Sequence, residues 1–201
     1  MSHRRLLIAG VDEVGRGAVF GPVVAAAVIL DETAAESLKR QGLNDSKKLS
    51  PQRRQDLVVP IRALAIDCQV GMASVREIER LNILQASLLA MRRAVLKLTP
   101  VPDLCRVDGN QLIPELTCSQ EAWIKGDQRD GAIAAASVIA KVWRDDLIVR
   151  LARHYPGYAL ESNKGYGSHQ HRSAIQQLGL TRQHRRSFRC CQMALPLELE
   201  D

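Results

Sequence analysis

The chain has 201 residues, of which 46% are hydrophobic and 25% charged, and its formal net charge is +6 at pH 7. This balance is typical of a globular protein with a substantial core. No stretch reaches the ~18 apolar residues of a membrane-spanning helix, and the five cysteines include no C-x-x-C pair, which argues against a zinc knuckle or a disulfide framework. We therefore expect an unexported, cytoplasmic protein with reduced thiols.

The first half of the chain predicts a hairpin followed by helices. Two apolar, valine-rich runs over residues 5–15 and 18–30 are separated by a glycine-containing turn, which is typical of a β-hairpin with a buried first strand. Short helices are expected over 31–42 and 50–65, the second with Ser50 as N-cap before a proline. The polar loop 43–49 lies between them.

The second half predicts three more strands and two more helices. Residues 65–74 alternate in polarity as a strand does, and a helical apolar period covers 81–98. The segments 103–110 and 121–128 each predict a short strand that ends in aspartate beside glycine. One long helix is expected from Gln128 to about His154. The order favours an α/β fold built on a mixed sheet.

The positive charge is concentrated near the C-terminus, where another helix is expected over 170–178. Residues 162–197 contain no Asp or Glu but six Lys or Arg, and the remaining 22 basic and 22 acidic residues cancel. Such a segment is a candidate phosphate-binding surface, and a solvated basic tail is the alternative. The six cations are Lys164, Arg172, Arg182, Arg185, Arg186 and Arg189.

Acidic residues lie at or near the ends of three predicted strands: Asp12 and Glu13, then Asp108, then Asp127. Ligands of α/β folds bind at strand ends. If these acids converge, each like-charge contact at ~4 Å costs about 4 kcal/mol at an effective dielectric of about 20, so cations are needed. Oxygen ligands suit Mg²⁺ or Mn²⁺, and two such ions about 3.5–4 Å apart support in-line phosphodiester chemistry.

Each acid also has an ordinary structural explanation. Asp108 precedes Gly109 in a common turn sequence, and Asp127 is well placed to be the N-cap of the long helix. Neighbouring strand residues point to opposite faces of a sheet. Glu13 can therefore join Asp12 at one site only if the strand bends or ends there.

Two glycine-containing loops are candidate ligand contacts. Gly15-Arg16-Gly17 can present backbone N–H groups to an anion; a dinucleotide-binding loop is the alternative, although the G-x-G-x-x-x-G spacing fits it poorly. Tyr166 lies between glycines beside Lys164, which suits stacking on a sugar or base, and an ordinary turn tyrosine is the alternative.

Nine segments of the chain, given at the end of this paragraph in chain order, resemble ribonuclease HII, the bacterial type 2 ribonuclease H, over about residues 6–189. The resemblance implies a ribonuclease-H-like three-layer fold with a mixed five-stranded sheet, over a single domain 1–201 whose basic segment from about 155 to 201 helps to bind substrate. The segments are AGVDEVGRG, GPVVAAAVIL, LNDSKKLS, EIERLNIL, VDGN, IKGDQ, AAASVIAKVWRD, NKGYGSHQH and HRRSF.

The resemblance also implies an activity. The family hydrolyses RNA in RNA–DNA hybrids and nicks duplex DNA 5′ to a single embedded ribonucleotide, leaving 3′-hydroxyl and 5′-phosphate ends. It uses Mg²⁺ or Mn²⁺, two ions per site with substrate bound, and metal-bound water attacks phosphorus without a protein nucleophile. Its roles are ribonucleotide excision repair and RNA primer removal. The catalytic, metal-binding acids fall on Asp12, Glu13, Asp108 and Asp127.

The substrate-binding residues of the family can be carried over in the same way. Gly15, Arg16 and Gly17 match the motif that contacts the 2′-hydroxyl at the RNA–DNA junction, and Tyr166 matches the junction-sensing tyrosine. Phosphate contacts fall on Lys47 and Lys164. A monomer is expected, with a sliding clamp as a candidate partner and no membrane association, while the tail Cys190–Asp201 matches no family feature.

Two functions from other classes remain as alternatives. A non-catalytic basic nucleic-acid-binding module would bind in a salt-sensitive way that does not depend on the four acids. A nucleotide-cofactor oxidoreductase would bind an adenine dinucleotide at the glycine loop.

Overall fold

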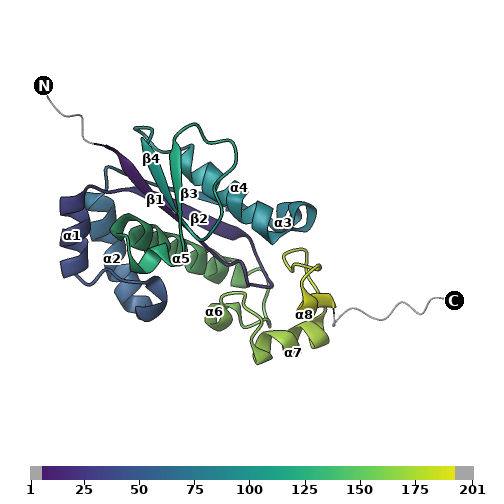
Figure 1. The fold of residues 1–201 in the computed structure, drawn as a ribbon. Coiled ribbons are helices and arrows are strands. Elements are labelled where there is room, and N and C mark those ends of the chain that lie inside the picture. The colour runs from purple at the N-terminus through teal and green to yellow at the C-terminus, as the bar shows by residue number, and fades with distance from the viewer. Residues whose placement is uncertain (1–5, 193–201) are drawn as a thin grey trace, which may run out of the picture.

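A mixed five-stranded sheet with helices on both faces forms the centre of the computed structural model, which describes residues 6–192 (Figure 1). The strand order is β3-β2-β1-β4-β5, with β1 antiparallel to β2, β2 antiparallel to β3, and parallel pairs β1–β4 and β4–β5. The expected α/β fold with a mixed sheet is therefore confirmed. The strands are β1 (Ile8–Val14), β2 (Val23–Ile29), β3 (Asp67–Ala73), β4 (Leu104–Asp108) and β5 (Ser119–Trp123).

The helices divide into two layers and a C-terminal group. The first two helices and the long α5 cover one face of the sheet, and α4 covers the other, with α3 beside it. No helix within residues 6–192 is both long and apolar enough to cross a membrane. The helices are α1 (Glu32–Arg40), α2 (Pro51–Leu64), α3 (Val75–Leu81), α4 (Ile83–Val95), α5 (Gly131–Ala152), α6 (Leu160–Asn163), α7 (His169–Leu178) and α8 (Arg189–Gln192), with 3-10 turns η1 (Ser46–Lys48) and η2 (Gly126–Gln128).

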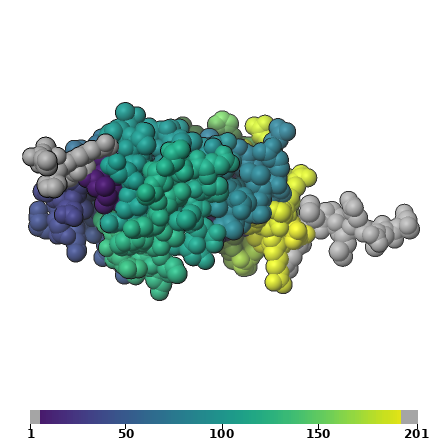
Figure 2. Space-filling view, turned by 45° about the horizontal axis from the view of Figure 1, so that its top comes forward, coloured from purple at the N-terminus to yellow at the C-terminus, as the bar shows by residue number. Residues whose placement is uncertain are grey.

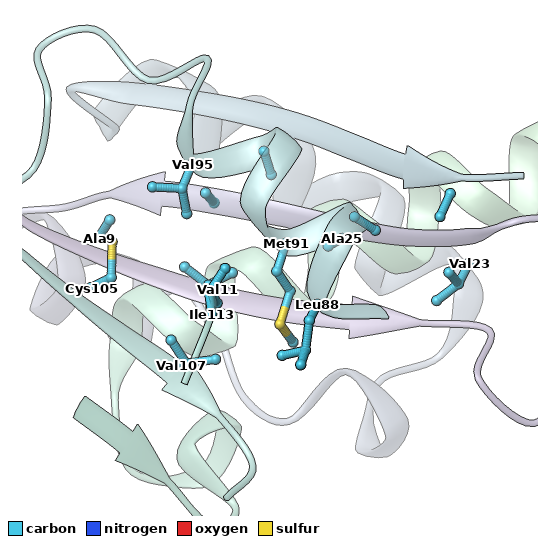
Figure 3. Close-up of a cluster of buried hydrophobic side chains, with 14 of the residues drawn as sticks. Ala9, Val11, Val23, Ala25, Leu88, Met91, Val95, Cys105, Val107 and Ile113 are labelled. Carbon is cyan, nitrogen blue, oxygen red and sulfur yellow. The ribbon is translucent and has the colours of Figure 1, made fainter. Parts of the chain in front are cut away.

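The α4 layer buries a continuous apolar cluster against the sheet (Figure 3). Leu88 and Met91 of α4 pack on alternate residues of β1, among them Val11. Burial of each such large side chain contributes about 1.5–3 kcal/mol. The cluster fixes the position of β1, the strand that carries Asp12, relative to α4.

The α5 layer lies very close to β1. The helix presents a run of buried alanines to the sheet, and a Cβ atom on Gly10 would lie 2.1 Å from the backbone carbon of Ala132. Only glycine lets the helix and the strand approach this closely, so Gly10 sets the position of the α5 N-terminus relative to β1.

We expect Gly10→Ala to lower the free energy of unfolding by about 3 kcal/mol, because the methyl group overlaps backbone atoms that cannot rotate away. Gly17→Ala is the matched control, since no heavy atom lies within 4 Å of a Cβ there. Urea denaturation measures both. Equal unfolding midpoints for the two variants would show that α5 shifts freely.

Several expected boundaries were wrong. The second strand begins at Val23, and residues 18–22 form a loop, because their apolar side chains are buried by C-terminal segments and not by a sheet neighbour. The last strand ends at Trp123, and the long helix begins only at Gly131. The helix expected from residue 81 begins at Ile83 and follows a separate helix, α3, that was not predicted.

The C-terminal elements form a third apolar cluster with the end of α5 and the loop that precedes β2. Phe20 of that loop packs with Ile148 of α5 and Tyr158, and Phe20 contacts the His184 ring edge to face at 5.0 Å between centroids. Figure 2 shows the C-terminal residues, in yellow, against the blue surface of α3, where Ser187 donates its hydroxyl to Glu79. The expected helix over 170–178 is α7.

Candidate active site

Carboxylates gather where β1 and β4 end side by side. Asp12 lies two residues before the end of β1, and Asp108 is the last residue of β4, in adjacent parallel strands. Asp12 and Asp127 are buried, at 6% and 4% exposure. Asp108 is close enough to Asp12, Glu13 and Asp127 for its charge to raise the pKa of each. The four predicted acids therefore form one electrostatic group centred on Asp108.

Asp12 and Glu13 approach Asp108 from opposite faces of the sheet. Asp12 faces α5 and forms a hydrogen bond with Ser137, whereas Glu13 borders a small cavity with Leu88 of α4 and Asp108. Strand β1 continues to Val14, so the side-chain alternation holds. Glu13 nevertheless lies close enough to Asp108 for the charge of that carboxylate to raise its pKa.

Burial and like charges dominate the electrostatics of these acids. Burial raises the pKa of Asp12 well above its usual value, and Glu13 and Asp108 raise it further, while the hydrogen bond with Ser137 opposes this. Burial also raises the pKa of Glu13, although Arg16, 3.1 Å away, lowers it. The positive charge near Asp12 and Glu13 is therefore too small to offset the burial and mutual repulsion of their ionised carboxylates.

Asp127 comes from a different kind of element than expected. It lies in η2, four residues beyond β5, and the N-cap of α5 is Asp130, whose carboxylate accepts from the N–H groups of Ala132 and Ile133. Asp127 is therefore not a helix cap. Burial raises its pKa, and Asp108 raises it further.

A lysine and an unpredicted acid complete the group. The Lys47 ammonium lies 3.7 Å from Asp127; partial burial lowers its pKa, but surrounding carboxylates, Asp127 foremost, outweigh this and raise it. Asp45, 4% exposed, caps η1 and lies close enough to Asp127 for its charge to raise the pKa of that carboxyl. Sequence reasoning missed Asp45, because an aspartate in a polar loop carries no signal of burial.

The glycine loop and Tyr166 lie together beside the acids. Arg16 and Gly17 are exposed, and Ala18 forms a β-bridge with Tyr166. The Nζ of Lys141 lies 5.4 Å from the centroid of the Tyr166 ring. Two segments that are about 150 residues apart in the sequence thus form one surface next to Glu13.

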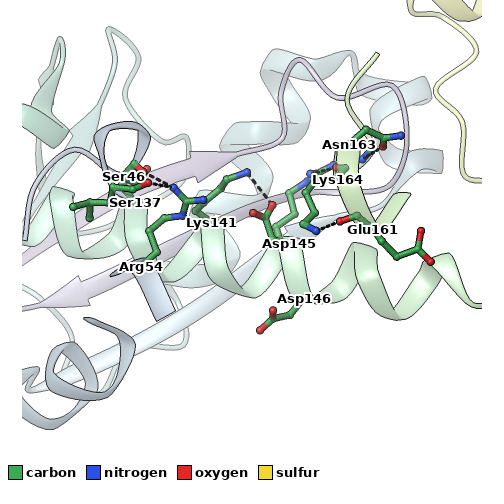
Figure 4. A network of polar contacts seen from close by, with 12 residues as sticks. Ser46, Arg54, Ser137, Lys141, Asp145, Asp146, Glu161, Asn163 and Lys164 are labelled. Carbon is green, nitrogen blue, oxygen red and sulfur yellow. Dashed lines mark hydrogen bonds and ion pairs between the residues drawn. The ribbon is translucent and has the colours of Figure 1, made fainter. Parts of the chain in front are cut away.

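Among the predicted substrate-binding residues, Lys164 directs its side chain toward its own short helix. Its ammonium donates to the Glu161 carbonyl of its own short helix, and its backbone has a positive φ of 51°. Figure 4 shows this side chain with Lys141, which pairs with Asp145 at 2.9 Å, and with Arg54, which reaches Ser46.

The acids do not form a ready coordination shell. No three His, Cys, Asp or Glu side chains of residues 6–192 are arranged to hold a metal ion. The donor set nevertheless suits a divalent cation, because buried oxygen ligands with raised pKa are stabilised when a positive charge is added. Asp12, Asp108 and Asp127, with Glu13 from the other face, are the residues that fit.

This sheet order, with carboxylates near the ends of β1 and β4, places the protein in the class of ribonuclease-H-like nucleases, whose fold its solved structural relatives share. Residues 9–191 match the family model described as Ribonuclease HII. The chain belongs to that family and is an RNA-hydrolysing type 2 ribonuclease H.

Known relatives agree over nearly the whole chain. A Ribonuclease HII of Acaryochloris marina is 66% identical over 94% of this chain and 95% of its own length. The ribonuclease H2 structure of Pyrococcus horikoshii is 28% identical, with a TM-score of 0.78 over 94% of this chain and 97% of that one. The RNase HII of Archaeoglobus fulgidus, solved in complex with PCNA, is 28% identical, with a TM-score of 0.77 over 91% and 95%.

Proposed function

We propose that this protein cuts the RNA strand of RNA–DNA hybrids and nicks duplex DNA on the 5′ side of a single embedded ribonucleotide. The observation that carries the proposal is the juxtaposition of two devices: a group of buried acids around Asp108, and the exposed Arg16-Gly17 backbone beside Tyr166. The first suits phosphodiester hydrolysis, and the second suits contact with a sugar on the neighbouring nucleotide.

The chemistry requires divalent ions, and Mg²⁺ or Mn²⁺ fits the oxygen donors. Asp12, Glu13, Asp108 and Asp127 would hold two such ions, which would supply positive charge to the attacking and the leaving oxygen. Water would attack phosphorus in line and the bond to the 3′ oxygen would break, which gives 3′-hydroxyl and 5′-phosphate ends. Asp12 is held in place by its hydrogen bond with Ser137 and by the Glu13 N–H, 2.7 Å from its Oδ1. No protein side chain is needed as nucleophile.

The chain's own cations attract and orient the substrate. Lys47 is largely exposed while its ammonium stays next to Asp127, so it can contact the phosphate that faces the acids. Lys164 reaches phosphate by rotation of its side chain, which bonds only to a backbone carbonyl. The basic segment beyond residue 155 adds affinity for the duplex that depends on salt.

The test is a DNA duplex that carries one ribonucleotide, labelled at the 5′ end of that strand, with Mg²⁺ or Mn²⁺ and then with excess chelator. We expect a nick 5′ to the ribonucleotide that the chelator abolishes, and no cut in the matched all-DNA duplex. Salt-sensitive binding without any cut would instead support the non-catalytic module.

The cellular role follows from this substrate choice. We propose ribonucleotide excision repair and RNA primer removal, in the cytoplasm, by a monomer acting as a single catalytic domain. A sliding clamp is a candidate partner, as the Archaeoglobus relative was solved with PCNA. The tail of the chain, expected to match no family feature, lies from residue 193 outside the described residues.

A further inference from the structure

Two arginines, Arg144 of α5 and Arg185 near the C-terminus, are fully buried, each with 0% exposure. A buried guanidinium is unfavourable unless its N–H groups and charge find partners. Within residues 6–192 neither arginine forms an ion pair with a carboxylate. Their partners are backbone carbonyls, and most of these belong to the loop 15–22.

Four backbone carbonyls of this loop accept hydrogen bonds from the two buried guanidinium groups. Arg144 binds two of them near the start of β2, and Arg185 binds two others, one of which is in the glycine motif. The bonds run from Arg144 Nε to Pro22 at 3.1 Å and Nη2 to Phe20 at 3.0 Å, and from Arg185 Nε to Gly21 at 3.0 Å and Nη1 to Arg16 at 2.9 Å.

Arg144 also holds the tyrosine loop. Its Nη1 donates to the Lys164 carbonyl at 2.9 Å, and its guanidinium carbon lies 5.4 Å from the centroid of the Tyr166 ring. Gly15 rests directly on the same side chain, with a φ of +89°, and a Cβ there would lie 2.1 Å from Nε. One guanidinium therefore contacts both loops that the proposed function assigns to the sugar.

Backbone bonds complete the connection. The N–H of Val19 donates to the Gly165 carbonyl at 2.9 Å, and the N–H of Gly21 donates to Gln183 at 2.8 Å. The N–H of Arg185 returns to the Val19 carbonyl at 2.8 Å. The glycine loop is thus fixed between the segment before Tyr166 and the segment that carries Arg185.

The bond to Arg16 fixes the direction of an exposed N–H group. The Arg16 carbonyl and the Gly17 N–H belong to the same planar trans peptide and point in opposite directions. Because Arg185 binds that carbonyl from the interior, the Gly17 N–H points away from the interior, toward the open surface where no heavy atom lies within 4 Å of a Cβ on Gly17.

We propose that Arg144 and Arg185 are positioning residues for substrate selection: they hold the Gly17 N–H and the Tyr166 ring at a fixed separation that matches a ribonucleotide followed by a deoxyribonucleotide. This inference rests on the proposed function. A planar guanidinium can bind carbonyls in several directions at once, whereas a lysine ammonium keeps the charge but not this fork.

The test compares Arg185→Lys and Arg144→Lys with Arg150→Lys, an exposed arginine on the same helix as Arg144. The substrates are a DNA duplex with one ribonucleotide and a continuous RNA–DNA hybrid. Each enzyme is assayed well below its unfolding temperature. We expect kcat on the single-ribonucleotide duplex to fall about 10–100-fold in both test variants, since a displacement of 1 Å can have this effect. The preference for that duplex over the hybrid should fall too, while Arg150→Lys behaves as wild type.

A merely structural role would lower the unfolding temperature and leave this preference intact in the folded protein. If both lysine variants keep the wild-type rate and preference, the positioning role is wrong and the proposed function stands. If the wild type cuts neither substrate, both fail.

If the variants do not fold, amide hydrogen exchange on the wild type tests whether the glycine loop is rigidly held. The Val19 and Gly21 amides should then be as protected as amides in the middle of α5. Exchange as fast as at an exposed loop such as Asn110 would overturn the proposal.

Discussion

Asp12→Asn should abolish cleavage and, in the absence of divalent ions, make the folded protein more stable. Burial and neighbouring like charges raise the pKa of the Asp12 carboxyl, so its ionised form destabilises the metal-free fold. Asparagine retains the oxygen that accepts from the Glu13 N–H but not the charge that a divalent ion requires. We expect cleavage to fall about 10³-fold or more, since several kcal/mol of transition-state stabilisation depend on the bound ions.

The stability gain should depend on pH with a defined sign. A carboxyl whose pKa is raised in the folded state stabilises the fold below its unfolded pKa of about 3.9, and this contribution is lost as pH rises through the folded pKa. Because the asparagine of the variant does not titrate, the stability of Asp12→Asn relative to wild type should increase from about pH 4 upward and then level off.

Thermal unfolding in chelator, followed from acid to neutral pH, measures this difference. The unfolding temperature rises by roughly 2–4 °C for each kcal/mol of repulsion removed. Asp146→Asn, at an exposed position of α5, is the control and should show neither effect. A variant that is less stable than wild type at neutral pH without metal would mean that Asp12 is compensated by a partner in the fold.

The sequence predicted that the acids of β1 and β4 lie close together, because Asp12 and Asp108 each follow an apolar run that forms a strand. Asp12 lies two residues before the end of β1 and Asp108 ends β4, and parallel pairing of these strands is sufficient to bring the two acids together. Glu13 raised a geometric question, because β1 continues to Val14, yet Glu13 borders a small cavity that Asp108 also lines.

The roles of Asp127 and Asp45 cannot be predicted from the residues next to them in the sequence. An aspartate just before a helix can be a cap or a ligand, and only the hydrogen bonds of Asp130 to the first turn distinguish the two. Asp45 is buried because η1 lies against α5, where Ser46 and Ser137 are 2.8 Å apart. That contact joins segments 91 residues apart, which no local window contains.

The loop 15–22 was misjudged for a similar reason. Val19 and Phe20 look like strand residues, but they are buried against the end of α5 and the elements that follow it. The helix α3, by contrast, had a local signal that was overlooked, since Ser74 and Glu77 form a capping box at its start.

Asp127→Asn should abolish cleavage while binding of an RNA–DNA hybrid is kept or becomes tighter. The substitution removes one negative charge from the surface that faces the phosphate and frees the Lys47 ammonium, now 3.7 Å from Asp127, to contact the substrate. We expect a fall in cleavage of about 10³-fold, as at Asp12, with an unchanged unfolding temperature or a small gain, because Asp127 does not cap the helix.

Asp130→Asn is the matched control, three residues away at the true N-cap. The variant loses the 2.7 Å ion pair between Arg106 and the Asp130 carboxylate, whose side chain is 8% exposed, and should be less stable than wild type, but asparagine caps about as well as aspartate. Cleavage should therefore stay within a few-fold of wild type. Single-turnover cleavage and filter binding of the same hybrid measure both variants. Equal activity of Asp127→Asn and Asp130→Asn would remove Asp127 from the catalytic group and leave the acids of β1 and β4 to bind the ions alone.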